Sequence, residues 1–258
     1  MKYATVAKRD QKSHDMEDYI CEQLKNHDWE YDEQHPQLVI CVGGDGTLLF
    51  GVHKYIDDLD HINFIGIHTG TLGFFTDYTA DEVDRCIEDL VSTKEPEIYE
   101  SKLLEFKIDD EEKSYYALNE IRIENIIKSQ SIDVFIDGEY FETCKGSGVC
   151  LSTQAGSTAY NRSLKGAVID SGISLMELTE ITPIHHSVHR SLGVPYIMME
   201  SRVIMMYSKS FDTAILCYDH LHMPLNEAHY ITCRMSNHKV KFARYRSYSY
   251  LKRLKNLY

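Results

Sequence analysis

The sequence lacks the features that mark membrane-embedded and secreted proteins. None of its apolar runs approaches the roughly 20 residues that a helix needs to cross a bilayer. Met1 to Val6 lead into charged residues, without the apolar stretch of a secretory signal. Of the 258 residues, 43% are hydrophobic and 26% are charged, as in ordinary globular domains. The composition predicts a folded protein with no membrane partner.

Closely spaced cysteines are also missing. The seven cysteines are an odd number, they are scattered, and no C-x-x-C pair occurs. Cys41 and Cys150 stand inside apolar runs, where a cysteine acts as a small buried side chain. This usage indicates a reducing compartment, and we expect a cytoplasmic protein.

The net charge has the wrong sign for a protein that wraps nucleic acid. There are 40 acidic against 27 basic residues, a formal charge of −13. The last part of the chain is the exception, because residues 228–258 carry eight Lys or Arg and no Asp or Glu. A basic tail on an acidic body more often packs onto that body than binds a polyanion, so we expect no nucleic-acid partner.

The first third of the chain alternates strand-like and helix-like text, which is typical of βαβ units. Leu38–Val42 is a wholly apolar run of the kind found in a parallel strand buried on both faces. The pattern predicts strands at 1–7, 38–42 and 63–67, and helices at 15–26, 47–55 and 79–91.

The pattern changes near Pro96, where the sequence begins to predict antiparallel strands. Asp137-Gly138 is a strong hairpin signal. The expected strands are 103–108, 115–124, 131–144, 203–207, 214–218 and 240–243. We therefore predict an α/β N-terminal domain, a β-rich C-terminal domain and a tail, at residues 1–97, 98–243 and 244–258.

The sharpest motif is Gly43-Gly44-Asp45-Gly46-Thr47, between a predicted strand and a predicted helix. Glycines let the backbone approach a ligand, and the start of a helix offers N–H groups to phosphate. An acid in such a loop repels phosphate unless it holds a metal or takes a proton. The alternative is a plain strand–turn–helix corner in which Asp45 caps the helix.

A second motif, His68 to Phe75, also follows a buried strand, at the end where open α/β sheets bind ligands. Its aromatic pair suits a nucleotide base or ribose, or else fills the core. A third motif, Leu118-Asn119-Glu120, lies in an alternating strand. Adjacent strand residues point to opposite faces, so both polar groups reach one ligand only at a strand end or a bulge. The alternative is a solvated edge.

A fourth segment, Gly146 to Asn161, combines glycines, an apolar strand and a small-residue loop before a predicted helix capped by Ser157 or Thr158. It offers a second helix N-terminus to an anion, or is an ordinary strand-to-helix connection. The histidines are weaker signals. His185, His186 and His189 lack a cysteine partner, so no metal site is predicted. His220 and His222 would share a strand face, and Asp219 would point the other way.

In this order and at this spacing, the four segments resemble the NAD kinases, and Phe242 to Ser247 looks like the ending of the shorter bacterial members. The resemblance covers nearly the whole chain. It implies an α/β domain and a β-rich, NAD-binding domain with the active site between them, and a tail that returns to the first domain. It also implies transfer of the terminal phosphoryl group of ATP (or polyphosphate), with Mg²⁺, to the 2′-hydroxyl of the adenosine ribose of NAD, giving NADP. Family members form homodimers or homotetramers.

The resemblance also implies roles for single residues. Asp45 would be the general base, with Gly44, Gly46 and Thr47 along the phosphate path. Phe74 would pack on the adenine, and Asn119 and Glu120 would hold ribose hydroxyls. The remaining expected contacts to the substrates are Lys145, Ser147, Thr158, Ala159, Tyr160, Asn161, Arg162, Ser163, Thr182 and, near the phosphates, His220.

The chain departs from the family pattern in the substrate pocket. Ser147 replaces an aspartate that contacts NAD, and Gln154 and Ala155 replace a proline and a hydroxyl residue. Thr71 stands where histidine is frequent, and Phe75 where tyrosine can occur. Two alternatives follow: a nucleotide-binding homologue with altered or lost activity, or another kinase of lipids or small molecules that carries GGDGT.

Overall fold

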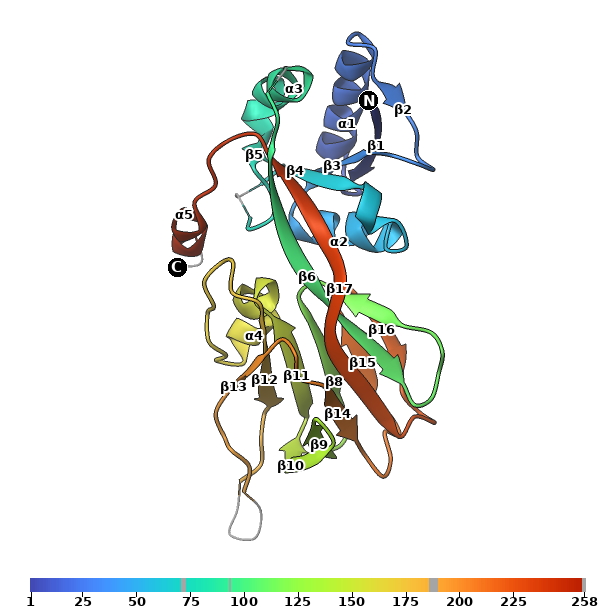
Figure 1. Ribbon diagram of the computed structural model, residues 1–258, viewed down its shortest axis with the longest axis vertical. Coiled ribbons are helices and arrows are strands. Elements are labelled where there is room, and N and C mark those ends of the chain that lie inside the picture. The colour runs from blue at the N-terminus through green and yellow to red at the C-terminus, as the bar shows by residue number, and fades with distance from the viewer. Residues whose placement is uncertain (71–72, 93, 186–189, 257–258) are drawn as a thin grey trace. The chain divides into compact units, whose positions relative to one another are not determined.

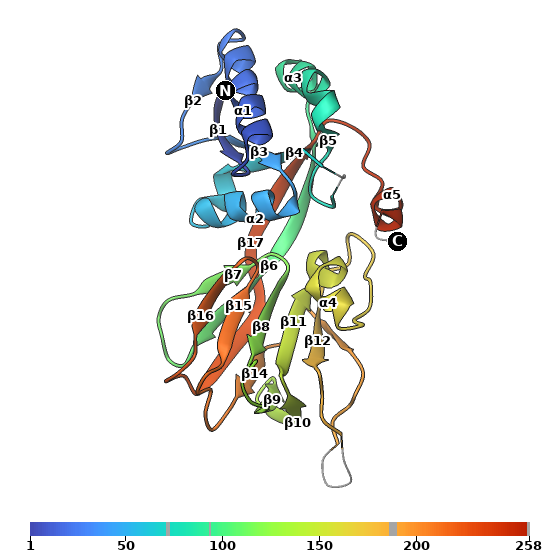
Figure 2. The same ribbon diagram turned by 180° about the vertical axis from the view of Figure 1, so that it is seen from behind.

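The computed structural model describes residues 1–70, 73–92, 94–185 and 190–256. The chain forms two compact units (Figures 1 and 2). The first unit is Met1–Ser101 with His238–Tyr258, and the second unit is Lys102–Asn237. Two long strands, β6 (Glu97–Ile108) and β17 (Tyr230–Arg244), belong partly to each unit. No helix of the described residues is long and apolar enough to cross a membrane.

The first unit is built on a parallel sheet in the order β17-β4-β3-β1-β2, with β5 paired to β4. Helices α1 and α3 pack on one face of this sheet and α2 on the other (Figures 1 and 2). Besides β17 and β6, the elements are β1 (Lys2–Ala7), α1 (Gln11–Lys25), β2 (Glu30–Tyr31), β3 (Leu38–Gly43), α2 (Asp45–Lys54), η1 (Leu59–His61), β4 (Asn63–His68), β5 (Tyr78–Thr79), η2 (Ala80–Glu82), α3 (Val83–Val91) and α5 (Tyr250–Lys255).

The predicted strands and helices of the first unit are present, but three helices begin elsewhere. Helix α1 begins at Gln11 because the Asp10 carboxylate accepts a hydrogen bond from the Ser13 N–H and caps it. Helix α2 begins at Asp45, with Gly44 as its N-cap. The predicted helix at 79–91 opens with a 3₁₀ turn, and Thr79 and Glu82 form a capping box there.

The second unit contains two sheets around one apolar core. One sheet follows the order β10-β9-β14-β17, with β6 on β17 and β7 on β6, and the other follows β13-β12-β11-β8-β15-β16. Besides β6 and β17, its elements are β7 (Tyr115–Ala117), β8 (Glu120–Glu124), β9 (Gln130–Ile136), β10 (Glu139–Gly146), β11 (Gly148–Thr153), η3 (Ala155–Thr158), α4 (Tyr160–Ser163), β12 (Leu175–Ile181), β13 (Tyr196–Met199), β14 (Ile204–Tyr207), β15 (Ile215–Tyr218) and β16 (Leu221–Pro224).

Several strand predictions for the second unit need correction. The hairpin at Asp137-Gly138 is confirmed, with φ values of 53° and 83° that suit a tight β-turn. The single strand expected at 115–124 is two strands, β7 and β8. The chain breaks between them because the Asp219 carboxylate accepts hydrogen bonds from the Leu118 and Asn119 N–H groups. The last predicted strand, 240–243, is only the end of the 15-residue β17.

The basic C-terminal residues pair with acids of the first unit, as the charge pattern predicts. Arg246 lies 2.9 Å from a Glu82 carboxylate oxygen, at the surface. Arg244 and Arg253 both bind the Asp77 carboxylate, and all three side chains are buried. A buried charge is tolerated only when it is paired, so this cluster fixes the tail on its own unit.

Candidate functional site

In the first unit, the motif that ends β3 places Asp45 as the first residue of α2. One carboxylate oxygen accepts a hydrogen bond from the Phe74 N–H at 2.9 Å, and the other accepts one from the Phe75 N–H at 3.0 Å. Asp45 does not cap its own helix, since Gly44 holds that position and no side-chain cap bond forms there. Two backbone donors therefore fix the orientation of a half-exposed carboxylate.

Gly73 leaves room for this carboxylate. A β-carbon at residue 73 would lie 2.3 Å from an Asp45 oxygen, so only glycine fits. The His68 ring lies next to Gly44 of the motif. Its Nδ1 accepts a hydrogen bond from the Gly70 N–H at 2.7 Å. Burial lowers the pKa of this imidazole, and the nearby Asp45 opposes that shift. The sequence flagged the segment from His68 onward but gave this histidine no role.

Of the aromatic pair after Gly73, one side chain is buried in the core and the other is partly exposed. Phe75 is buried and stacks on Phe242, with 5.4 Å between the ring centroids, so the core alternative holds for it. Phe74 is half-buried and lies 5.8 Å from the ring of Tyr250. Thr47 is buried inside α2. Of these three residues, only Phe74 keeps part of its side chain accessible to a ligand.

In the second unit, Asn119 and Glu120 stand at the start of β8, the position that allows adjacent polar groups to serve one ligand. Asp219 holds them there through the Leu118 and Asn119 N–H groups, at 2.8 and 2.7 Å. The Asp219 N–H in turn donates to the Glu120 carbonyl. The expectation that Asp219, His220 and His222 lie on one strand is wrong, because residues 219 and 220 form the turn between β15 and β16.

Both side chains of this pair end in a buried oxygen without a partner. Asn119 Oδ1 and Glu120 Oε2 have no hydrogen bond within the described part of the chain. Burial, together with the nearby Asp219 charge, raises the pKa of the Glu120 carboxyl to about 7, against the attraction of Arg122. Buried polar atoms are normally paired. These two adjacent exceptions are free acceptors, which hydroxyl groups can satisfy.

The segment after β11 packs closely against this pair. A β-carbon at Gly156 would lie 2.0 Å from the Asn119 carbonyl oxygen, so the 3₁₀ turn η3 needs glycine there. The predicted helix capped by Ser157 or Thr158 is wrong. The structure has η3 and then the one-turn helix α4, whose N-cap Ala159 has no side chain able to cap it. The Ser157 hydroxyl instead accepts a hydrogen bond from the Ile169 N–H.

Two expected contact residues on α4 are already engaged within the unit. The Tyr160 hydroxyl donates to a Glu124 oxygen at 2.5 Å, and the Arg122 guanidinium lies 3.8 Å from the centre of the Tyr160 ring. The Asn161 amide is fully buried, donates to Glu177 and accepts from Thr179. Asn161 therefore stabilises the turn through buried hydrogen bonds.

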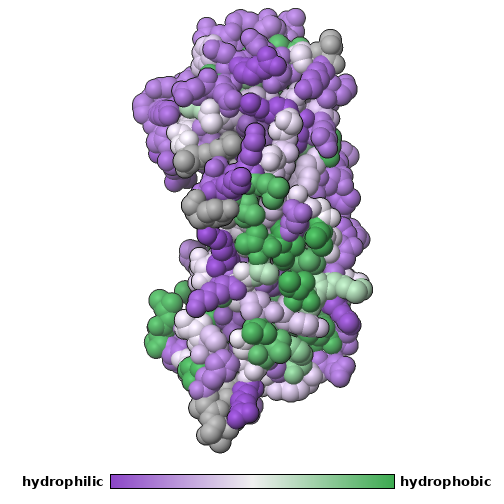
Figure 3. Space-filling view, turned by 90° about the vertical axis from the view of Figure 1, so that its left-hand side faces the viewer, coloured by the Kyte–Doolittle hydropathy of each residue, from purple (hydrophilic) through white to green (hydrophobic). Residues whose placement is uncertain are grey.

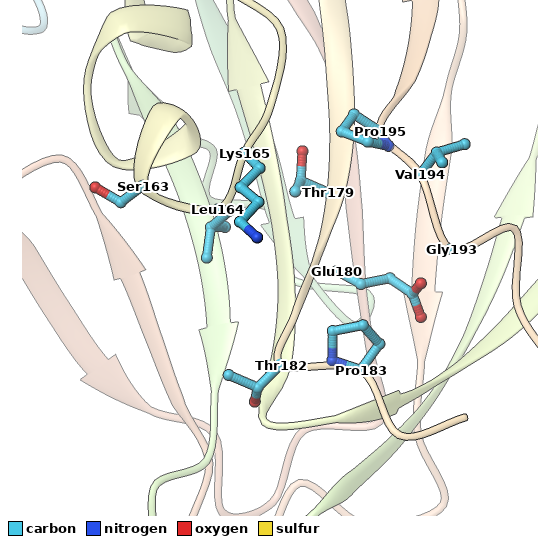
Figure 4. A pocket seen from close by; sticks show the side chains of 10 residues that line it. All are labelled: Ser163, Leu164, Lys165, Thr179, Glu180, Thr182, Pro183, Gly193, Val194 and Pro195. Atoms are coloured by element: carbon cyan, nitrogen blue, oxygen red, sulfur yellow. The ribbon is translucent and has the colours of Figure 1, made fainter. Parts of the chain in front are cut away.

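A cavity of about 440 Å³ lies beside this turn (Figure 4). Its walls come from the residues after α4, the end of β12 and the segment before β13: Ser163, Leu164, Lys165, Thr179, Glu180, Thr182, Pro183, Gly193, Val194 and Pro195. Two of these, Ser163 and Thr182, were expected substrate contacts. The Thr182 hydroxyl donates to the Ser147 hydroxyl at 2.6 Å, so Ser147 lies next to the wall of this cavity.

The other expected contact residues lie on several different elements. Lys145 is half-buried at the end of β10, and His220 is exposed in the turn after Asp219, not on a strand. Thr158 ends η3, Ala159 is the N-cap of α4, and Arg162 lies within α4. No cluster of three or more metal-ligating side chains occurs among the residues with described positions. Thr71, His186 and His189 lie outside them.

Sequence reasoning missed the residues that hold the site in place. Asp219 has a positive φ of 49°, which Asp adopts more readily than most residues in a tight turn. Its position between two strands is the only signal the sequence carries. Arg122 and Glu124 are a second case: alternate residues of β8 on one face, 2.9 Å apart, that hold Tyr160.

Comparison with known proteins matches two long segments of the chain to one family. Residues 3–95 match the family described as ATP-NAD kinase N-terminal domain, and residues 118–245 match ATP-NAD kinase C-terminal domain. NAD kinase 1 of Bacillus subtilis (strain 168) is 38% identical over 260 residues, covering 99% of this chain and 97% of the relative. NAD kinase of Geobacillus stearothermophilus is 34% identical over 258 residues, covering 98% and 95%. The chain belongs to the NAD kinase family.

Two solved structures share the fold. An NAD kinase from Archaeoglobus fulgidus in complex with ATP superposes with a TM-score of 0.79 and 23% identity, over 100% of this chain and 97% of the other. Yeast NADH kinase complexed with NADH superposes with a TM-score of 0.82 and 20% identity, over 100% and 87%. These likenesses confirm the predicted fold class, an α/β N-terminal part followed by a β-rich part.

The raised pKa of Glu120 predicts that the pair reduces stability in the absence of ligand. An unfolded chain releases this proton near pH 4.5 and the folded chain near pH 7, so unfolding becomes easier as the pH rises through that window. We expect Glu120→Gln to match the wild type at pH 4.5 and to gain roughly 1–3 kcal/mol in unfolding free energy at pH 8. Urea unfolding at several pH values measures the difference. The exposed Glu139→Gln is the control, and equal pH slopes in Glu120→Gln and wild type would contradict the assignment.

Proposed function

We propose that Asp45 is the general base of the NAD kinase reaction in this chain. The reaction transfers the terminal phosphoryl group of ATP to the 2′-hydroxyl of the adenosine ribose of NAD and yields NADP. A ribose hydroxyl is a weak nucleophile near neutral pH, so a positioned carboxylate that accepts its proton speeds the attack. The two backbone N–H groups on Asp45 support this role, because they fix both oxygens and leave further lone pairs for a hydroxyl.

We place the phosphoryl donor at the N-terminus of α2. Gly44 and Gly46 flank Asp45 without side chains, and the first N–H groups of a helix favour phosphate. Thr47 is buried in the first turn and supports the loop rather than contacting phosphate directly. We propose that Mg²⁺ arrives with ATP as part of the substrate, since Mg²⁺ is commonly held by phosphates and one or two carboxylates.

The unpartnered oxygens of Asn119 and Glu120 are the observation that carries the substrate assignment. A ribose supplies hydroxyl donors for both, and a protonated Glu120 also has a proton to donate. We propose that Phe74 packs on the adenine, and that Ser163, Thr182 and Ser147 contact the nucleotide from the cavity side. Ser147 retains a hydrogen-bonding oxygen there, which favours an active enzyme over a homologue that has lost NAD binding.

Formation of NADP by the purified protein tests this function. We expect NADP from NAD and ATP in the presence of Mg²⁺, and loss of the activity when EDTA removes the metal, because the triphosphate charge is then uncompensated. Diacylglycerol is the comparison acceptor for the alternative kinase. Turnover of diacylglycerol but not NAD, or NAD binding without turnover, would overturn the proposal.

Asp45→Asn tests the base directly. We expect kcat to fall by about 10²–10⁴, the usual contribution of a positioned base. The new amide N–H₂ must face either the Phe74 or the Phe75 N–H, donor against donor, so a stability loss of about 0.5–1.5 kcal/mol accompanies the change. Kinetics on the folded variant, with thermal unfolding in parallel, separate the two effects. A kcat within threefold of wild type would remove Asp45 as the base.

We further propose that the protein is a cytoplasmic homodimer or homotetramer that binds no nucleic acid. All seven cysteines are free thiols, and the net charge is −13. Strand β13 is an edge of its sheet, and apolar side chains gather on that face of the second unit (Figure 3). On and just before β13, Val194, Ile197 and Met199 are 63%, 45% and 67% exposed. An exposed apolar edge strand is stabilised by a second copy.

Sedimentation equilibrium tests the assembly. We expect a mass of two or four times 29.9 kDa at micromolar concentration, and a shift toward monomer in Met199→Glu, which puts a charge on the apolar edge. Exposed Glu139→Gln serves as the control. A wild-type protein that sediments as a monomer at every concentration would rule out the oligomer.

A further inference from the structure

The orientation of Asp45 depends on a short loop that the motif itself does not contain. We call residues 73–77 the carboxylate loop, because its Phe74 and Phe75 N–H groups bind the Asp45 carboxylate. Gly73 begins the loop in van der Waals contact with that carboxylate. A shift of the loop therefore moves both donors that hold Asp45.

The C-terminal helix α5 holds this loop through one side chain. Arg253 is 5% exposed, and its guanidinium donates to the carbonyl oxygens of Gly73 and Thr76 and to the Asp77 carboxylate. These three acceptors stand at the first, fourth and fifth residues of the loop. Arg253 thus binds the loop on both sides of the two N–H groups that face Asp45.

Neighbouring residues reinforce the same contact. The Tyr248 hydroxyl donates to the Phe74 carbonyl at 3.2 Å. The guanidinium carbons of Arg253 and Arg244 lie 4.6 and 4.2 Å from the centre of the Tyr248 ring, and Arg244 also binds Asp77. A planar guanidinium can serve several fixed acceptors at once, which a flexible ammonium cannot reproduce.

We propose that Arg253 is a positioning residue for Asp45: by holding the carboxylate loop, the last helix of the chain sets the orientation of the catalytic base. The proposal rests on the role of Asp45 given above. A purely structural Arg253 would instead contribute only to stability, through its buried ion pair with Asp77. The two roles differ in whether the effect of losing Arg253 passes through Asp45.

The first test compares Arg253→Ala and Arg253→Lys with Lys252→Ala, which removes the same charge from an exposed position on the same helix. A displacement of about 1 Å at a reacting group costs up to about 10²-fold in rate. We expect kcat to fall by about 10- to 100-fold in Arg253→Ala, with the KM for ATP within threefold of wild type. Arg253→Lys should recover only part of the loss, and Lys252→Ala should equal wild type.

The decisive measurement is a double-mutant cycle with Asp45→Asn. If Arg253 acts through Asp45, the double variant is as slow as Asp45→Asn alone, to within about threefold. Added methylguanidinium should then raise the rate of Arg253→Ala but not that of the double variant. The proposal would be overturned if the kcat losses of the two single variants multiply in the double variant, or if the kcat of Arg253→Ala equals that of wild type. An Asp45→Asn variant with normal kcat would instead refute the base itself, so the two failures are distinguishable.

Tyr248→Phe keeps the proposal testable if Arg253→Ala does not fold. This change removes one hydroxyl, and with it only the hydrogen bond to the Phe74 carbonyl. One lost hydrogen bond corresponds to about a 2- to 12-fold decrease in kcat. We expect that decrease in the wild-type background and none in the Asp45→Asn background. An equal decrease in both backgrounds, or no decrease in either, would contradict control of Asp45 by the loop.

Discussion

The pair of hydrogen bonds from the Phe74 and Phe75 N–H groups to Asp45 is the constraint on which the first unit's chemistry depends. A carboxylate at a helix start would otherwise rotate freely or cap the helix. Here backbone donors from a different loop fix both oxygens, and the loop itself is fixed by the buried ion pairs of Asp77 with Arg244 and Arg253. Preorganised donors of this kind need no rearrangement during the reaction.

In the second unit, hydrogen bonds to the backbone also fix the position of the polar pair, but the burial of its side chains lowers the stability of the fold. Asp219 fixes the backbone of Asn119, which stabilises the pair's position. Asn119 Oδ1 and Glu120 Oε2 nevertheless have no hydrogen-bond partner among the residues that the structure describes, which costs stability. The raised pKa of Glu120 has the same origin, because burial disfavours the charged carboxylate. Functional sites often carry such strain, and the surrounding sheet compensates for it.

Local patterns predicted the fold class and the local position of the key motifs. The apolar run at Leu38 and the Asp137-Gly138 turn specify their structure through near neighbours, and both are confirmed. Two features that these patterns did not predict depend on distant partners. The break between β7 and β8 comes from Asp219, 101 residues away, and Arg253 binds the Gly73 carbonyl from 180 residues away. Neither partner is visible in hydrophobic periodicity, because both contacts are polar and single.

The two loop amides hold the Asp45 carboxylate through hydrogen bonds, and amide proton shifts report such bonds directly. Selective ¹⁵N labelling of the nine phenylalanines makes the Phe74 and Phe75 signals assignable in a 29.9 kDa protein. We expect downfield amide protons at both positions in the wild type. Both should move upfield in Arg253→Ala and stay in place in Lys252→Ala. Signals that do not move in Arg253→Ala would contradict control of the Asp45 carboxylate by the loop.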